Sequence, residues 1–301
     1  MSNLLVCGHI NLETTLRVDQ FPLDYFPVRY PFFGVRSTTA GVGYNIAKAL
    51  TTLGDQVRLL SLIGQDEVGT LVQHSLEADG IGNVGVLAAM PETCQSVILY
   101  DGNGRRQIHT DLKDVQSRPY PPNIFQQYLP WCDLAVLCNI NFSRPFLGLA
   151  RQAGKAIASD VHAISDLEDE YNRDYMAAAD ILFMSHERLP DSPEVWARKV
   201  QERFGTAVLV IGLGADGALL AVKKDNFMER IPAVFTRPIV NTIGAGDALF
   251  AAFIHSYLQT GNPYTAIQPA LTFASYKIGA VGAAEGFLTA VELAELVNRK
   301  P

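Results

Sequence analysis

The chain has 301 residues, of which 48% are hydrophobic and 18% are charged, with a formal net charge of −7. This composition is ordinary for a globular protein, and the negative charge argues against a DNA or RNA partner because a nucleic-acid backbone requires a basic surface. The four cysteines form no CxxC pair, so we expect reduced thiols rather than a disulfide framework or a structural zinc site. The start lacks a signal-peptide pattern, and no stretch approaches the roughly 18 apolar residues of a membrane span. We therefore expect a cytoplasmic protein with no membrane partner.

Short apolar segments alternate with amphipathic segments along most of the chain. In chain order, apolar runs predict strands at residues 4–7, 57–63, 134–138, 156–159, 181–184 and 208–211. Helical spacing of apolar residues predicts helices between several of them, at residues 45–53, 68–76 and 193–204. This alternation predicts an α/β fold in which a central, mostly parallel sheet is flanked by helices.

Two segments interrupt the alternation. Residues 16–40 are rich in Pro, Phe, Tyr and Arg and contain a candidate strand pair at 16–18 and 35–39. Residues 97–110 have the pattern of a hairpin, because Asp-Gly and Asn-Gly pairs provide its turn. Neither segment suits a buried parallel sheet. The sequence therefore predicts one α/β domain over residues 1–301, with a small β-sheet lid formed by insertions at residues 12–40 and 95–112.

The stretch IVNTIGAGDALF, residues 239–250, carries the strongest chemical pattern. Its β-branched start predicts a strand, Gly244-Ala245-Gly246 predicts a turn, and apolar residues 248–258 predict a buried helix. Amides in the first turn of a helix lack intrahelical partners and lie at the positive end of the helix dipole, so the turn can bind phosphate. Asp247 can then accept a proton from an attacking hydroxyl. The alternative is that the glycines only permit close packing and Asp247 only caps the helix.

This stretch resembles the signature of the ribokinase (PfkB) family, which usually reads DTxGAGD. Other family elements follow in order: VCGHINLE at 6–13 resembles the first strand, AGVGYN at 40–45 the GGxxxN motif, IGQDEVG at 63–69 the GxDxxG stretch, and LVIGLGADG at 209–217 the nucleotide-binding strand and loop. The resemblance implies a ribokinase-like fold. It also implies transfer of the γ-phosphate of ATP, as its magnesium complex, to a hydroxymethyl group of a sugar or a nucleoside.

The resemblance assigns roles to individual residues. It implies that Asp247 is the general base and that the anion hole is formed by Gly244, Ala245 and Gly246. The residues that it places against the substrate are Asn11, Glu13, Gly41, Val42 and Asn45. Those that it places against ATP are Gly212, Gly214, Gly217 and Thr242.

Four positions depart from the family pattern. Asn241 replaces the aspartate that opens the signature, and the lost charge near the family's monovalent-cation site weighs against potassium activation without excluding it. The NxxE motif that orders Mg²⁺ is not evident, so Glu187 is the candidate metal residue, with an ordinary exposed glutamate as the alternative. Gly212 stands where many members have threonine, and Glu13 where they usually have aspartate. Together the departures indicate a divergent substrate class or weakened nucleotide binding.

Several functions and roles stay open at this point. A sugar kinase is the leading hypothesis, and a nucleoside kinase that stacks a base on Phe32, Phe33 or Tyr44 is the alternative. A catalytically weak sensor of sugars or nucleotides is favoured by the missing NxxE and opposed by the intact GAGD. A dinucleotide-dependent dehydrogenase is disfavoured because the first strand lacks the glycine fingerprint.

Two surface features also have alternative interpretations. Arg105 and Arg106 follow the hairpin turn and either reach an anion from the lid or stay solvated. The aromatic residues at 30–33 either line the substrate cavity or form a homodimer interface through the lid.

Overall fold

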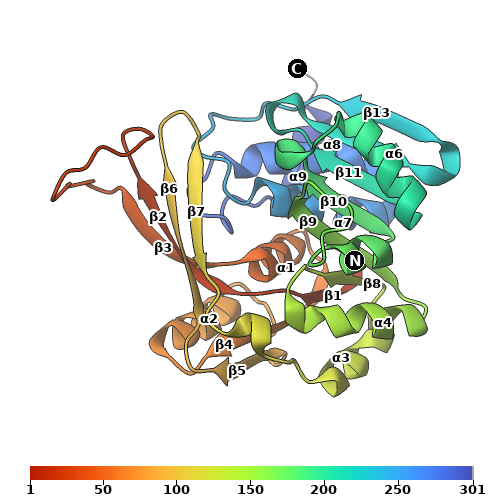
Figure 1. Ribbon diagram of the computed structural model, residues 1–301, viewed down its shortest axis with the longest axis horizontal. Coiled ribbons are helices and arrows are strands. Elements are labelled where there is room, and N and C mark those ends of the chain that lie inside the picture. Colours follow the sequence, from red (N-terminus) through yellow and green to blue (C-terminus); the bar gives the residue numbers. More distant parts are fainter. Residues whose placement is uncertain (300–301) are drawn as a thin grey trace.

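The computed structural model describes residues 1–299, and its main element is a nine-stranded sheet (Figure 1). The strands run in the order β13-β12-β11-β10-β9-β8-β1-β4-β5. Pairing is parallel from β11 to β5, and only β12 and β13 at one edge pair antiparallel. The bounds are β1 (Asn3–Cys7), β4 (Gln56–Gly64), β5 (Val86–Met90), β8 (Leu134–Leu137), β9 (Ala156–Ala163), β10 (Ile181–Ser185), β11 (Val208–Gly212), β12 (Ala218–Val222) and β13 (Phe227–Ile231).

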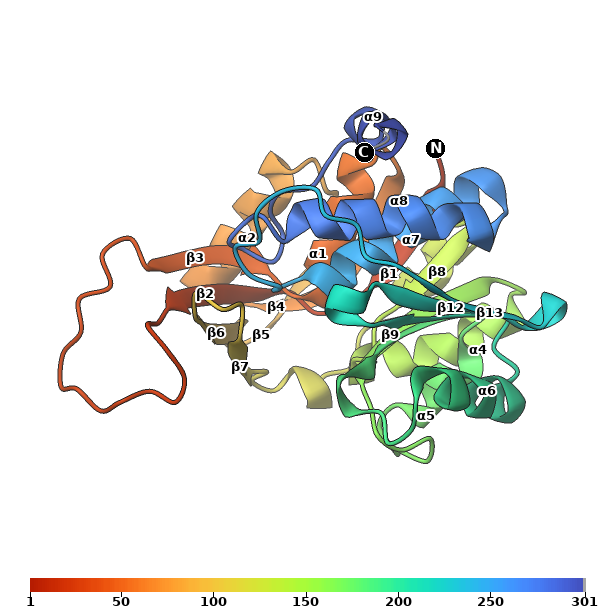
Figure 2. The same ribbon diagram turned by 90° about the horizontal axis from the view of Figure 1, so that it is seen from above.

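Helices cover both faces of this sheet, as Figure 2 shows. One layer contains α1 (Val42–Thr52), α2 (Glu67–Ala78), α7 (Ala245–Thr260), α8 (Pro263–Lys277) and α9 (Ala290–Asn298). The other contains α3 (Pro122–Tyr128), α4 (Arg144–Gln152), α5 (Arg173–Ala178) and α6 (Pro193–Phe204). Successive residues of β1 enter different hydrophobic clusters, Leu4 and Val6 on one face and Leu5 and Cys7 on the other. A strand buried on both faces reads as a continuous apolar run, which is why the sequence pattern identified it.

The helix α7 is the central helix of its layer. Its residues 247–254 are all buried, and it packs between α1 and α8. Phe183 of β10 fixes it against the sheet, because its ring lies 4.9 Å from that of Phe250 and 5.3 Å from that of Phe253. The N-terminus of α7 is therefore held in a defined place relative to the sheet.

A separate four-stranded sheet projects from the large one (Figure 1). Its order is β3-β2-β6-β7, with β2 (Asn11–Arg17), β3 (Val35–Ala40), β6 (Cys94–Tyr100) and β7 (Arg106–Asp111). The predicted fold class, a mostly parallel sheet flanked by helices with a small separate sheet, is confirmed. The predicted strands at 16–18 and 35–39 were too short, since β2 begins at Asn11. Asn11 and Glu13 therefore lie on the small sheet and do not continue the first strand.

The strand predicted at the start of the signature is wrong. Residues 239–243 form no strand, and α7 begins at Ala245. The backbone there pairs with another loop, since the Val240 amide donates to the carbonyl of Ile278 at 2.9 Å. The β-branched pattern therefore reflects loop packing, with Ile243 buried, rather than a place in a sheet.

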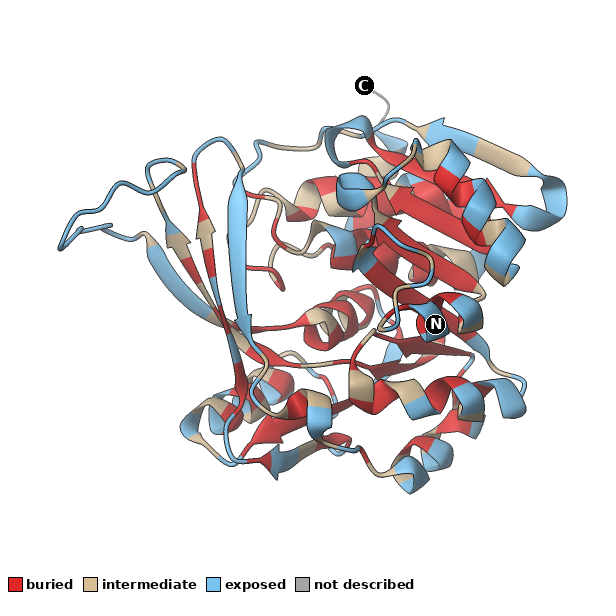
Figure 3. Cartoon of the chain, in the orientation of Figure 1, coloured by how far each residue is buried: buried red, intermediate tan, exposed pale blue. Residues whose placement is uncertain are grey.

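The connection between β2 and β3 is a long exposed loop (Figure 3). Its apolar side chains face solvent, with relative exposures of 91% for Tyr25, 85% for Phe32 and 105% for Phe33. Among residues 1–299, no helix combines the length and apolar character needed to cross a membrane.

Candidate active site

The turn at the start of α7 forms the centre of the site. Gly244 is the N-cap with a φ of 72°, and an added Cβ would lie 2.6 Å from the carbonyl oxygen of Ala283, so only glycine fits. Gly246 differs, because the nearest heavy atom to an added Cβ is Asp160 Oδ2 at 3.9 Å. Within residues 1–299, the amides of Gly246 and Asp247 have no hydrogen-bond acceptor. Free amides over open space at a helix N-terminus can bind an anion.

Asp247 lies in the first turn of α7, directly beside these amides. It is buried, with 9% relative exposure, and Asn45 Nδ2 donates to its Oδ2 at 2.6 Å. Burial raises the pKa of Asp247 to about 6, and the nearby Asp160 adds to the increase, whereas the Asn45 hydrogen bond opposes it. A carboxyl group with this pKa is ionised at neutral pH and accepts a proton more readily than an exposed aspartate.

Gly41 positions Asn45. It is the N-cap of α1, with a φ of 100°, and an added Cβ would lie 2.7 Å from the carbonyl oxygen of His9. α1 begins at Val42, three residues before the predicted start, so Asn45 lies in its first turns. The Asn45 amide donates to the Gly41 carbonyl at 2.8 Å, and this local geometry directs its side chain to Asp247.

Asn11 and Glu13 enter the site from β2 of the small sheet. Asn11 Nδ2 donates to Ser96 Oγ on β6 at 3.0 Å, and Glu13 Oε1 accepts from the Ala283 amide at 3.1 Å. Burial raises the pKa of Glu13. The Oδ1 atoms of Asn11 and Asn45 are buried, and no donor among residues 1–299 reaches them. Buried acceptors of this kind are suited to hydroxyl donors, because an unpaired buried oxygen is costly.

The residues predicted to bind ATP lie around the carboxyl end of β11. His186 Nδ1 donates to the carbonyl oxygen of Gly212 at 2.8 Å, and Gly214, with a φ of 61°, lies beside the same imidazole. The fold itself requires a glycine at position 217, because an added Cβ would lie 2.1 Å from the Ile231 carbonyl oxygen.

Arg106 of β7 contacts two residues that the resemblance assigns to the nucleotide and its metal. Its guanidinium donates to Thr242 Oγ1 and lies 3.5 Å from Glu187 Oε1. A cavity of about 690 Å³ is lined by Arg106, Glu187 and the hairpin residues around them. Arg105 lines the same cavity, but its guanidinium pairs with Asp101 at 2.7 Å and donates to the carbonyl of Phe21 at 3.4 Å. Arg106 therefore contacts predicted site residues directly, whereas the contacts of Arg105 are within the lid.

Three residues at the site were not predicted: Asp160 and Lys277 near the turn, and Ser96 beside Asn11. Asp160 is buried at the carboxyl-end half of β9 and directly follows the predicted strand 156–159. Its position at such a strand end was the available signal, because ligands gather there in α/β sheets. Ser96 has no special pattern in the sequence. A lysine in the last turn of a helix is usually exposed, so nothing in the sequence indicated that Lys277 is buried.

The acidic groups at the site fit a metal that arrives with the nucleotide. Among residues 1–299, no group of three or more His, Cys, Asp or Glu side chains could hold a metal ion alone. Mg²⁺ usually keeps several waters and takes one or two carboxylates plus substrate phosphates. Glu187 is half exposed beside the cavity and could be such a carboxylate.

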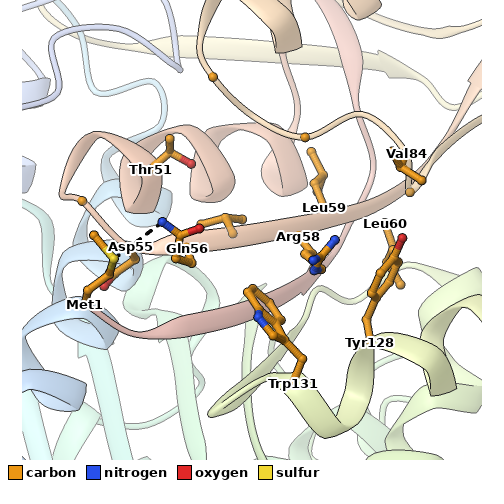
Figure 4. A pocket seen from close by; sticks show the side chains of 15 residues that line it. Met1, Thr51, Asp55, Gln56, Arg58, Leu59, Leu60, Val84, Tyr128 and Trp131 are labelled. Atoms are coloured by element: carbon orange, nitrogen blue, oxygen red, sulfur yellow. Dashed lines mark hydrogen bonds between the residues drawn. The ribbon is translucent and has the colours of Figure 1, made fainter.

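Another cavity, of about 450 Å³, lies at the amino end of β4 (Figure 4). There Arg58 lies against the faces of Tyr128 and Trp131, 4.6 and 4.8 Å from the two ring centroids. The cavity shares no lining residue with the site assembled above. Because active sites of parallel α/β sheets form at the carboxyl ends of strands, this cavity is not the candidate site.

Comparison with known proteins agrees with this geometry. The family described as pfkB family carbohydrate kinase matches residues 1–133 and 148–290. The chain is 27% identical to an ATP-dependent ribose-1-phosphate kinase of Halopiger xanaduensis, over 94% of each protein, and 25% identical to an acarbose 7(IV)-phosphotransferase of an Actinoplanes species, over 87% of each. Among solved structures, a microbiome-derived acarbose kinase has a TM-score of 0.89 and 25% identity, with 99% of each chain covered. A ribokinase-like structure from Agrobacterium tumefaciens, with a TM-score of 0.86 and 20% identity over 99% of this chain and 98% of that one, shares the fold.

Proposed function

The chain belongs to the PfkB family of carbohydrate kinases, and we propose that it transfers the γ-phosphate of ATP to a hydroxymethyl group of a sugar, with Asp247 as the general base. The observation that supports this most is the pairing of Asp247 with Asn45 beside the free amides of Gly246 and Asp247. The family resemblance seen in the sequence is confirmed, and so is the assignment as an ATP-dependent sugar kinase.

The proposed reaction uses the two halves of this arrangement together. Asp247 takes the proton of the acceptor hydroxyl while the hydroxyl oxygen attacks the γ-phosphorus of ATP. The bond between this phosphorus and the bridging oxygen breaks, and ADP leaves. The Gly244–Gly246 turn holds the negative charge of the transferred group through backbone amides and the dipole of α7. Phosphoryl transfer depends mainly on positioning and charge stabilisation, and a general base typically adds roughly 10²–10⁴-fold.

The acceptor side favours a sugar over a nucleoside. The unpaired Oδ1 atoms of Asn11 and Asn45 can accept from two hydroxyl groups, and Glu13 provides a further acceptor. Of the three candidate rings for base stacking, Tyr44 is 2% exposed in the core, and its hydroxyl donates to Asp79. Phe32 and Phe33 lie exposed on the long loop. We infer that Gly41 and Val42 contribute backbone to the same acceptor site.

The nucleotide side is proposed from the end of β11 together with the 690 Å³ cavity that Arg106 and Glu187 line. Gly212 and Gly214 would contact ATP at the end of β11, and Gly217 would shape that loop. Thr242 and Arg106, which are hydrogen-bonded to each other, would exchange this bond for contacts with the phosphates of ATP. Mg²⁺ would neutralise phosphate charge when bound with ATP, and Glu187 is the residue of this chain proposed to orient it.

We propose that the small sheet, with insertions at 12–40 and 95–112, acts as a lid on a single domain. Its contacts with the body support this, since Arg36 pairs with Glu285 at 2.5 Å, and Ile98 and Tyr100 pack with Ile243 in a hydrophobic cluster. The exposed aromatic residues of the loop at 18–34 support a homodimer through the lid. Light scattering on the wild type and a Phe32→Ser/Phe33→Ser variant tests this, since a monomeric wild type would contradict it. The four cysteines are free and buried, in agreement with the proposed cytoplasmic location.

An acceptor panel tests the proposed function. ADP release from Mg-ATP would be measured with ribose, ribose 1-phosphate, fructose, acarbose and several nucleosides, each against a reaction without acceptor. Product analysis by ³¹P and ¹³C NMR would locate the new phosphate ester. We expect turnover with a sugar and a phosphate on a hydroxymethyl oxygen. Turnover with nucleosides alone would favour the nucleoside kinase, and binding of sugar and ATP without turnover would favour the sensor.

A further inference from the structure

A fully buried lysine lies behind the glycine turn. Lys277 is the last residue of α8 and has 0% relative exposure. Its ammonium donates a hydrogen bond to the carbonyl of Ile243, the residue immediately before the N-cap Gly244. Lysine is almost never fully buried unless it is paired, and the reaction described above does not use this one.

Four charged side chains act on this ammonium. Burial lowers the pKa of Lys277 to about 8, the carboxylates of Glu13, Asp247 and Glu285 oppose that shift, and Arg237 adds to it. In return, Lys277 lowers the pKa values of Asp247 and Glu13, which burial raises. The ammonium is thus charged at neutral pH and compensates two buried carboxylates of the proposed acceptor site. Burying a charge costs stability, so a position that keeps one is a candidate for a functional role.

Asn241 binds a second carbonyl of the same loop region. Its Nδ2 donates to the Val281 carbonyl oxygen at 2.9 Å, and its Oδ1 accepts from the Ile243 amide at 3.0 Å. An ionised aspartate here would have no proton to donate to Val281, and its carboxylate oxygen facing the carbonyl oxygen would need a cation between them. The two carbonyls of Ile243 and Val281 are therefore bound by donors of the chain itself. Carbonyl oxygens are the ligands that potassium takes in proteins, so these two do not fit an added ion.

We propose that Lys277, together with Asn241, is a built-in cation site that holds the glycine turn and the charges of Glu13 and Asp247 in their working arrangement, so that turnover needs no added monovalent cation. The proposal rests on the proposed kinase function. Lys277 is a positioning residue in this account, because its contact is with the Ile243 carbonyl.

The test compares wild type with Lys277→Ala in choline, potassium and ammonium chloride at equal ionic strength. Wild-type kcat should agree within about twofold in the three salts. In choline, kcat of Lys277→Ala should fall by roughly 10²-fold, because the turn whose amides stabilise the developing anion loses its support, with little change in KM for ATP. Potassium or ammonium should recover at least about tenfold, because a small cation can enter the space that the side chain leaves.

A second readout does not depend on turnover. Potassium should raise the melting temperature of Lys277→Ala and leave that of wild type unchanged relative to choline, because an ion that binds only the native state stabilises it. Lys155→Ala is the matched control. Its ammonium also donates to backbone carbonyls, those of Pro130 and Cys132, but just before the amino end of β9. This variant should keep wild-type kcat and show no specific response to potassium.

The outcomes separate the proposal from the proposed function. Stimulation or stabilisation of the wild type by potassium would overturn the built-in cation, as would full activity of Lys277→Ala in choline or a loss that no cation restores. If Lys277→Ala does not fold, the wild-type salt comparison decides. A wild type without kinase activity, combined with the expected melting behaviour, would leave the cation site standing and overturn the function instead.

Discussion

Gly246→Ala is expected to separate stability from activity at the anion hole. Gly246 is exposed in the first turn of α7, and an added methyl group meets nothing closer than Asp160 Oδ2 at 3.9 Å. Alanine in a helix is favoured over glycine by roughly 0.5–1 kcal/mol, so the fold should be unharmed or slightly stabilised. The methyl group would fill the space above the amides, where a phosphate oxygen must approach to about 2.9 Å. Loss of such a donor typically costs roughly 10²–10³-fold in kcat.

The assay is kcat on the identified acceptor, together with the melting temperature. The matched control is Gly148→Ala in α4, where an added Cβ meets no atom within 4 Å. Both variants should melt at or a few degrees above the wild-type temperature, and only Gly246→Ala should lose activity. Normal turnover of Gly246→Ala would refute the anion hole. A large drop in its melting temperature would contradict the open space that the structure shows around an added methyl group at position 246.

Three further predictions concern the groups around the turn. Because burial raises the pKa of Asp247 to about 6 and the base must be ionised, kcat/KM should fall about tenfold per unit as pH drops below 6; a pH–rate profile that stays flat to pH 5 would contradict this. Arg106→Gln should raise KM for ATP or lower kcat by about 10–100-fold, whereas Arg105→Gln, which loses the Asp101 pair and the Phe21 contact, should change both constants much less; equal effects of the two variants in steady-state kinetics would contradict the assignment. Glu187→Gln should have a smaller effect than Asp247→Asn, because Glu187 is half exposed; a Mg²⁺ titration would reveal a larger role as a much higher Mg²⁺ requirement.

The sequence predicted those parts of the fold that depend on local pattern. The buried strands of the large sheet read as apolar runs because both of their faces are covered, and the helix at 193–204 was predicted with its observed bounds, since Ser192 caps its start and Gly205 ends it in a left-handed conformation. The hairpin at 97–110 followed from its turn residues.

Long-range contacts decided the features that the sequence could not predict. Residues 239–243 have a strand-like composition, but their backbone pairs with the loop after α8. β2 was predicted too short because Asn11 and Glu13 are polar, and their burial comes from the site itself rather than from an apolar pattern. Tyr44 suited a base-stacking role by residue type, yet its position on α1 places it in the core.

The same distinction applies to the site. Motif resemblance identified Asn45 and Asp247, which lie 202 residues apart and share a hydrogen bond. Lys277 and Asp160 matter through the charges that they bring next to Asp247, and such effects depend on three-dimensional distances. The roles of the predicted site residues remain predictions for the experiments above.

The most direct test of the central claim is the kcat of Asp247→Asn on the acceptor found by the panel. A raised carboxyl pKa means that the folded state binds this proton more tightly, so the contribution of Asp247 to stability falls as pH rises from about 4 to 6. The neutral asparagine should therefore melt no lower than wild type at pH 7 and should bind ATP normally. We predict a fall in kcat of roughly 10²–10⁴-fold or more. Near wild-type turnover by a folded Asp247→Asn would contradict the account.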